Sequence, residues 1–468
     1  MNYKFVLLIL AQITLSLQLQ LPFHIGGSLP EASHSVHYSS IDTKDHPIDL
    51  TQYKNTYVVR IDYSKNGELE KYLKSKPSNE SCDSINFKRW GKNIAQKTID
   101  IQIDDENMVK LIQKFKSDLK LEFLIDDLPQ KIFETYPQVS IQSEDVITNS
   151  ELFFQDYRSL DTINAWLELL QSTYPDILSL EDIGETFEHR KMKVLHFTVP
   201  HEHSDGEGHG DRRTVVITGG VHSREWISIS STLYAIYELI ELYKVDSQSR
   251  IFSELDFLFI PVYNPDGYQY TWTTDRLWRK NRQETIKPHC FGIDIDHSFN
   301  YHWTRSSDWA CGEEYSGEHP FEAMESRIWS EYLNSTNADH KIWGFIDLHS
   351  YAEEILYPYA FSCEDRPRDE ENLIEVAYGL AKAIRLSTGR IYQVFAACLD
   401  RDADLLPDLG AGTILDYMYH NRADFAYQLK LRDTGNHGFL LPAKQIIPVG
   451  KEVVASLKYL FHFLVDTD

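Results

Sequence analysis

Hydrophobic and polar positions divide the chain into a poorly patterned start, a short patterned unit and a long patterned region. The short unit, residues 56–148, alternates between strand-like and helical patterns in the order TYVVRIDY, GELEKYLKSK, IDIQI, ENMVKLIQKFK and LKLEFLI. This order predicts a small α+β domain. We expect residues 17–55 to form a flexible arm, and the polar, unpatterned residues 141–152 to separate the small domain from the next one.

Strands and helices alternate in the long region, residues 153–468. Its first predicted helix lies in SLDTINAWLELLQSTYP, with Ser159 or Asp161 as the N-cap and Pro175 just beyond its end. Strand signals follow at KVLHFTV, TVVITGG, LDFLFIPVY, KIWGFIDLHS, IYQVFAA and FAYQLKLRD, and helical signals at STLYAIYELIELY, ENLIEVAYGLAKAIRL and KEVVASLKYLFHFLV. This alternation predicts an α/β fold with a largely parallel or mixed sheet.

Candidate chemistry lies where two of these strands end. The strand TVVITGG runs into His222 and Glu225, and a helical pattern follows at once. The strand KIWGFIDL ends in His349. Ligands of open α/β sheets bind at such strand ends, and two imidazoles with a carboxylate form a ligand set of catalytic zinc. Asp294, in FGIDID, could orient His222 through its second ring nitrogen.

Each of these motifs can also occur without any functional role. With 19 His in the chain, a His followed three residues later by a Glu also arises by chance, as a surface His beside a solvated Glu. The loop HEHSDGEGHGD, residues 201–211, carries three His, and we interpret it as a solvated loop rather than a metal site.

The net charge of −25 argues against nucleic acid or an anionic membrane surface as the main partner, because a polyanion would be repelled. At 468 residues and 42% hydrophobic content, the chain can bury a large core. Residues 1–16 have the features of a secretory signal: Lys4, an apolar run too short to span a bilayer, and the small Ser16 as a cleavage point. We find no transmembrane segment and expect a lumenal, vacuolar or secreted protein.

Passage through the oxidising secretory pathway makes disulfides plausible. The five cysteines are an odd number, so at least one stays free or pairs outside the chain. Two acceptor sequons, at Asn79 and Asn334, fit glycosylation on surface loops.

Several ordered blocks resemble the zinc carboxypeptidases of the pancreatic A/B type. They are GGVHSREWIS, VYNPDGYQYTWTTDRLWRKNR, GID, DLHSYAEEILYPY and LRDTGNHGFLLPAKQIIP, together with the pair Cys290 and Cys311. The resemblance implies a carboxypeptidase-like domain over residues 153–468, with a mixed eight-stranded sheet flanked by helices. The α+β domain over residues 56–148 resembles the N-terminal propeptide domain of that family, which covers the active-site pocket.

The resemblance also implies roles for individual residues. One Zn²⁺ would be held by His222, Glu225 and His349, and Arg279 would polarise the scissile carbonyl. The substrate groove would be lined by Arg224, Ser350 and Tyr351, and Leu415 would form the floor of an apolar specificity pocket. The implied disulfides are Cys290–Cys311 and, less closely matched, Cys363–Cys398, with Cys82 left over.

Three positions depart from the active members of the family. The general-base glutamate, two residues before the Arg of LRDTG, is replaced by Lys430, and an ammonium has no lone pair to accept a proton. The Asn-Arg pair that clamps the substrate carboxylate is replaced by Asp296 and His297. No Tyr stands near Asp408, where the mobile Tyr of the family should fall.

These departures predict a zinc-binding protein that has lost peptidase activity and acts by binding an unidentified peptide or protein. They resemble the fungal inactive members of the family, which implies a role in cell wall organisation and a vacuolar or extracellular location. One alternative is an active zinc hydrolase in which a neutral Lys430 serves as the base. Another is that zinc is purely structural, or that the pocket holds no metal.

Overall fold

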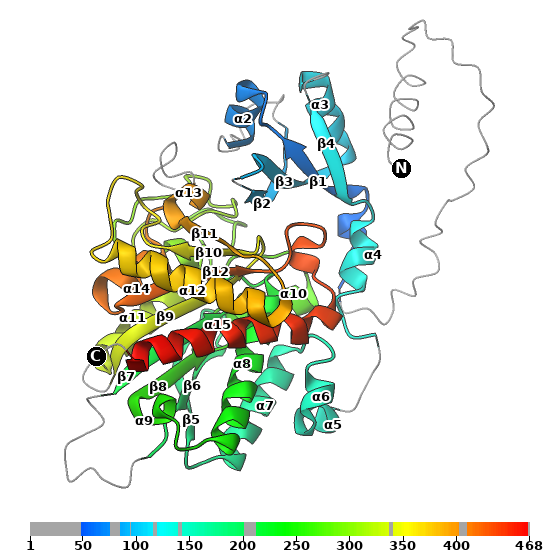
Figure 1. Ribbon diagram of the computed structural model, residues 1–468. Coiled ribbons are helices and arrows are strands. Elements are labelled where there is room, and N and C mark those ends of the chain that lie inside the picture. Colours follow the sequence, from blue (N-terminus) through cyan, green and yellow to red (C-terminus); the bar gives the residue numbers. More distant parts are fainter. Residues whose placement is uncertain are drawn as a thin grey trace, which may run out of the picture. The chain divides into compact units, whose positions relative to one another are not determined.

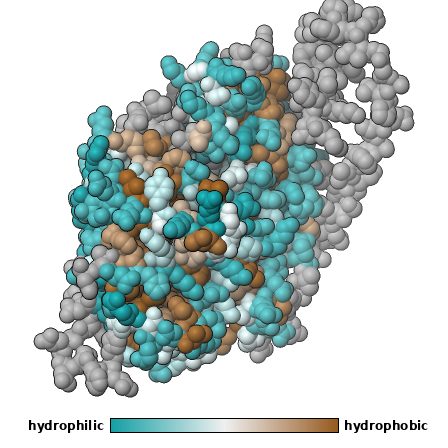
Figure 2. Space-filling view, in the orientation of Figure 1, coloured by the Kyte–Doolittle hydropathy of each residue, from teal (hydrophilic) through white to brown (hydrophobic). Residues whose placement is uncertain are grey.

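The structure is a computed structural model, and it describes residues 48–74, 85–93, 95–115, 119–138, 143–200, 212–336, 340–401 and 410–466. Two sheets organise this part of the chain (Figure 1). On the face in view, hydrophilic and hydrophobic residues are interspersed (Figure 2). Among the described residues, none of the helices combines the length and the apolar content that a bilayer crossing requires.

The smaller sheet has four antiparallel strands in the order β2-β3-β1-β4. Its elements are β1 (Thr56–Asp62), α2 (Gly67–Lys74), β2 (Lys88–Asn93), β3 (Thr98–Asp104), α3 (Asp105–Phe115) and β4 (Lys120–Ile125). Val59, Ile61 and Ile101 on the strands pack with Leu69 and Leu111 on the helices in a core of their own. The α+β pattern predicted for this segment is present, and β2 is an additional edge strand.

Two segments predicted to be irregular are partly helical. Part of the predicted arm forms the 3-10 helix η3 (Leu50–Tyr53), in which both end residues are buried, and Tyr53 donates a hydrogen bond to Asp275 at 2.5 Å. The polar segment 141–152 contains α5 (Ser143–Thr148) and the start of α6 (Ser150–Phe153). Asn149 caps α6 by accepting from two backbone N–H groups, an interaction that a hydrophobic pattern does not register.

The larger sheet has eight strands in the order β11-β10-β12-β9-β7-β8-β6-β5. Its strands are β5 (Leu178–Glu185), β6 (Lys191–Phe197), β7 (Arg213–Gly219), β8 (Leu255–Ile260), β9 (Lys341–Ser350), β10 (Glu354–Tyr357), β11 (Gln393–Ala396) and β12 (Phe425–Leu431). The neighbours β12, β9, β7 and β8 are parallel, whereas β5, β6 and β8 pair antiparallel, as do β10 and β12. The predicted mixed sheet is therefore confirmed.

Helices pack against this sheet, and the long α15 contacts both α8 and α12 (Figure 1). Ser159 caps α7, as one of the two alternatives predicted. The helices outside the smaller sheet are α4 (Leu128–Phe133), α7 (Leu160–Thr173), α8 (Trp226–Val245), α9 (Arg250–Glu254), α10 (Pro265–Thr273), η6 (Ile295–His297), α11 (Met324–Ser335), α12 (Glu370–Thr388), α13 (Ala397–Arg401), α14 (Ile414–Asn421), η8 (Gly438–Leu440), η9 (Ala443–Gln445) and α15 (Ile446–Asp466).

The parallel strands bring distant segments to one edge of the sheet. Because β12, β9 and β7 run in the same direction, their carboxyl ends lie together. In the register, Lys430 of β12 is opposite His349 of β9, and Gly219 at the end of β7 is opposite Leu348. The residues predicted to carry the chemistry therefore share this edge.

Candidate metal centre and the adjoining cavity

His222, Glu225 and His349 form a buried cluster whose ligand atoms all lie within 4.8 Å of one another. The Nδ1 atoms of the two imidazoles are 3.1 Å apart. Glu225 places Oε1 3.0 Å from Nδ1 of His222 and Oε2 3.1 Å from Nδ1 of His349. It stands at the N-cap of α8, but its side chain makes no capping hydrogen bond. The carboxylate is directed at the imidazoles instead.

Two further carboxylates orient the rings. Asp294 Oδ1 lies 3.1 Å from Nε2 of His222, the contact expected from the sequence, and Asp347 Oδ2 lies 2.7 Å from Nε2 of His349. Because a carboxylate only accepts, each Nε2 carries the proton that it donates. In the neutral imidazoles, both Nδ1 lone pairs then point at the Glu225 carboxylate. Carboxylates behind both histidines are typical of zinc sites, so the donor set fits Zn²⁺.

The electrostatics of the cluster favour a cation. Burial opposes protonation of His349, but the carboxylates of Asp347 and Glu225 raise its pKa to about 10. Burial also opposes the charge of Glu225, yet both imidazoles hold its pKa well below the usual range. The pKa of Asp294 is likewise lowered, against its burial, by Arg279 and His222. Added positive charge is therefore stabilised here.

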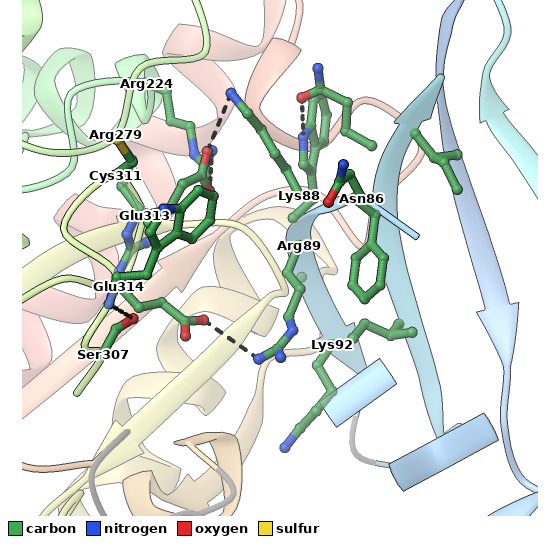
Figure 3. Close-up of a pocket in the computed structure, with 18 of the residues that line it drawn as sticks. Asn86, Lys88, Arg89, Lys92, Arg224, Arg279, Ser307, Cys311, Glu313 and Glu314 are labelled. Atoms are coloured by element: carbon green, nitrogen blue, oxygen red, sulfur yellow. Dashed lines mark hydrogen bonds and ion pairs between the residues drawn. The ribbon is translucent and has the colours of Figure 1, made fainter. Parts of the chain in front are cut away.

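A cavity of about 650 Å³ is lined not by the cluster itself but by residues next to it, among them Lys430, which is opposite His349 in the sheet. The large domain contributes Arg224, Arg279, His297 and Lys430 to its lining, and the small sheet contributes residues 86–92 (Figure 3). The sequence placed all four of these large-domain residues at the site, and the structure brings them to one cavity.

The two arginines are held by acidic partners. Arg279 donates to Asp294 Oδ2 from Nη2 at 2.8 Å, so Asp294 connects it to His222. Arg224 donates from Nη1 to both carboxylate oxygens of Glu313, each at 3.1 Å, and its guanidinium lies 4.2 Å from the centre of the Phe439 ring. Both guanidinium groups are therefore fixed at the cavity wall.

Lys430 lies where the sequence predicts a general base to be missing. Its Nζ donates to Asp400 Oδ1 at 2.6 Å, and the two side chains are 19% and 6% exposed. Glu354 of β10 is opposite Lys430 in the antiparallel register, and burial raises the pKa of Glu354 to about 7 although Lys430 opposes the shift. The ammonium therefore has carboxyl groups on two sides.

The remaining predicted groove residues are buried. Asp296 lies in η6, within 4.8 Å of the Asp347 and His349 ligand atoms, and His297 donates from Nδ1 to the Ala411 carbonyl at 3.0 Å. The backbone N–H of Ser350 donates to Glu225 Oε2 at 3.0 Å. Tyr351 donates to Asp100 of the small sheet at 2.9 Å, and Leu415 lies in α14.

Both expected disulfides are present, Cys290–Cys311 and Cys363–Cys398. Asn334 is exposed, but it lies in α11 rather than in a loop, and its side-chain oxygen accepts a hydrogen bond from Arg422. The expectation of a loop was wrong at this position because the helix continues through the sequon. Asn79, Cys82 and Asp408 lie outside the described residues, as does the predicted signal.

Sequence reasoning missed three acidic residues at this site: Asp347, Asp400 and Glu354. Asp347 is two residues before His349 on one strand, a spacing that puts both on one face, so its signal was available. Asp400 is 30 residues from Lys430 and reaches it only through the fold.

Comparison with known proteins identifies the class. The zinc carboxypeptidase profile matches residues 163–456, and the chain belongs to that family. Within it, the chain is 52% identical over 351 residues to the inactive metallocarboxypeptidase ECM14 of Saccharomyces cerevisiae, covering 74% of this chain and 81% of the relative.

A second curated relative is similar over the same share of the chain, and a solved structure agrees with the fold. The chain is 40% identical over 373 residues to the inactive metallocarboxypeptidase ECM14 of Ajellomyces dermatitidis, covering 74% of this chain and 62% of the relative, which is less than two thirds of its length. The crystal structure of thrombin activatable fibrinolysis inhibitor matches with a TM-score of 0.74 at 23% identity, over 88% of this chain and 100% of that chain. The predicted family and the predicted fold are both confirmed.

Proposed function

We propose that this protein binds zinc through His222, Glu225 and His349, has no peptidase activity, and acts by binding a peptide or protein ligand. The observation that carries the proposal is Lys430, whose ammonium lies at the cavity wall in an ion pair with Asp400. Close relatives in the family are named inactive metallocarboxypeptidases, which supports the same conclusion.

The residues of the cavity explain the lost chemistry. Bound zinc would supply a Lewis acid that lowers the pKa of a coordinated water. Lys430 cannot accept the proton of that water, and loss of a general base typically costs about 10² to 10⁴ in rate. Asp296 would repel the terminal carboxylate of a peptide, and His297 offers no guanidinium fork. Arg279 and Arg224 keep their positions and can still bind carbonyl or carboxylate oxygens.

The alternative of an active hydrolase requires Lys430 to be a neutral amine. The ion pair with Asp400 at 2.6 Å opposes this, because a nearby carboxylate stabilises the ammonium form. We therefore favour the binding protein over the enzyme.

Location and biological role are a further part of the proposal. We infer entry into the secretory pathway, with a vacuolar or extracellular destination, and a role in cell wall organisation. The inference is supported by the signal-like residues 1–16 and by the likeness to the fungal inactive members of the family. Affinity capture of wall and secretory proteins with the wild type and with a zinc-ligand variant would test it.

Metal content and turnover test the core of the proposal. We expect about one zinc per chain in protein purified without chelator, and its loss in His222→Ala. His189→Ala is the matched control, because the His189 side chain is 84% exposed and bonds to Glu185 on the surface. We expect no release of C-terminal residues from apolar or basic peptides. Zinc-dependent turnover that His222→Ala abolishes would refute the pseudoenzyme, and zinc near zero in the wild type would refute the metal site.

A further inference from the structure

The outer wall of the cavity belongs to the small sheet. Residues 86–92 line it consecutively, and β2 is one of the two edge strands of the sheet. Side chains of neighbouring strand residues alternate between the faces of a sheet, yet Lys88 and Arg89 both reach the same loop, at Glu313 and Glu314 (Figure 3). The edge of β2 is therefore turned toward the cavity, which residues of β3 also line. Such an edge is where an extended peptide can add by main-chain hydrogen bonding.

Charge in the cavity is opposite in sign to that of the whole chain. The net charge of the protein is −25. The lining contains four acidic residues, Asp104, Glu313, Glu314 and Asp400. Six basic residues outnumber them: Lys88, Arg89, Lys92, Arg224, Arg279 and Lys430. Asp294 pairs with Arg279 from behind the wall and reduces the surplus to one positive charge, which in an acidic protein still favours an anionic occupant.

The ion pairs that cross the cavity are long and partly exposed. Lys88 Nζ lies 3.7 Å from Glu313 Oε1, and Arg89 Nη1 lies 3.5 Å from Glu314 Oε1 (Figure 3). The Lys88 side chain is 47% exposed and that of Glu314 is 35% exposed. Exposed pairs of this kind contribute little stability. Carboxylates of a ligand can therefore take the place of Glu313 and Glu314 at little cost.

Other contacts fasten this wall to the large domain. The Trp90 ring packs on Phe439 with centroids 5.1 Å apart. Tyr351 donates to Asp100, which also accepts from Arg60 Nε at 2.7 Å. These buried contacts do not involve Lys88 or Arg89. The wall can therefore stay in place while Lys88 and Arg89 exchange Glu313 and Glu314 for carboxylates of a ligand.

We propose that the cavity is a composite binding site for an extended acidic peptide segment. The segment pairs with the edge of β2, and its carboxylates bind Lys88 and Arg89. The small domain is then part of the binding surface and not only a cover. This inference rests on the proposed binding function, for which it specifies the ligand class and the surface.

The test uses the full chain and a fluorescent hexapeptide of alternating Glu and Val, acetylated and amidated so that it has no terminal carboxylate. We expect binding that weakens as salt rises, and no binding of the counterpart with Lys in place of Glu. The double variant Lys88→Glu/Arg89→Glu should bind at least about tenfold more weakly. Lys110→Glu/Lys120→Glu, on α3 and β4, makes the same change in net charge away from the cavity and should bind as the wild type does.

Backbone methylation of alternate peptide nitrogens separates strand pairing from charge attraction. We expect the methylated peptide to lose binding although its charge is unchanged. Equal binding by the methylated peptide, or by Lys88→Glu/Arg89→Glu at an unchanged melting temperature, would overturn the proposal. Zinc content measured on the same samples keeps the two hypotheses apart, because a chain with one zinc and no peptide binding contradicts the composite site alone.

Discussion

Replacing Lys430 with glutamate would place the general base that the resemblance to active carboxypeptidases implies, and we expect it to destabilise the protein. Lys430 Nζ is 2.6 Å from Asp400 Oδ1, with Glu354 opposite in the register. The substitution adds a carboxylate beside these two acidic residues and removes the ammonium that pairs with Asp400. Removing one partner of a buried ion pair costs about 3–5 kcal/mol. Because the Lys430 side chain is 19% exposed, solvent screens part of this cost, and we expect a loss of about 2–3 kcal/mol.

Urea unfolding at pH 7 measures this loss as a lower midpoint with an unchanged slope. The double variant Lys430→Glu/Asp400→Lys restores opposite charges and should recover most of the stability. Lys451→Glu, at an exposed position of α15, is the matched control and should shift the free energy of unfolding by no more than about 0.5 kcal/mol. A midpoint equal to that of the wild type in Lys430→Glu would refute the reasoning.

Two further substitutions test buried features of the large domain. Burial raises the pKa of Glu325 to about 7, so the native state holds a proton that the unfolded chain releases near pH 4.5, and wild-type stability should fall as the pH rises from about 4.5 to 7. Glu325→Gln should remove up to about 3 kcal/mol of that decline, measured by unfolding at several pH values, whereas Glu331→Gln on the exposed face of α11 should not. Gly267→Ala would put Cβ 2.5 Å from the Lys280 carbonyl oxygen and should cost about 1–3 kcal/mol despite its better helix propensity. Gly67→Ala, with open space around it, should cost nothing, and equal melting temperatures for the two variants would contradict the packing argument.

Hydrophobic pattern predicted most strands, including the edge strands β4 and β11, but missed β2, β5 and β10. β7 and β8 are buried along most or all of their length and were recognised from their apolar runs. β2 carries charged residues and a glycine, β5 buries only its first residue fully, and β10 has four residues. β2 and β5 are edge strands, whose outward side chains can be polar, so their sequences do not alternate. β10 lies inside the sheet and is too short for its pattern to stand out.

Local sequence pattern likewise predicted only part of the candidate site. Strand ends predicted His222, Glu225 and His349, because these positions follow from local pattern. The partner of Lys430 could not be predicted from local pattern. It is Asp400, which α13 brings to β12 from a segment joined to the rest by the Cys363–Cys398 disulfide. Contacts between segments distant in the sequence depend on the packing of the whole domain, which no local pattern encodes.

The partners of Lys430 and His297 bear on the proposed loss of activity. A side chain that replaced a catalytic residue by drift alone would leave a buried charge without compensation, which is costly. Lys430 instead pairs with a carboxylate that is itself nearly buried, and His297 donates to a backbone carbonyl. Arg279 remains tied through Asp294 to His222. The charges of Lys430 and Arg279 are thus compensated beside the His222, Glu225 and His349 cluster, as the proposed binding function leads us to expect.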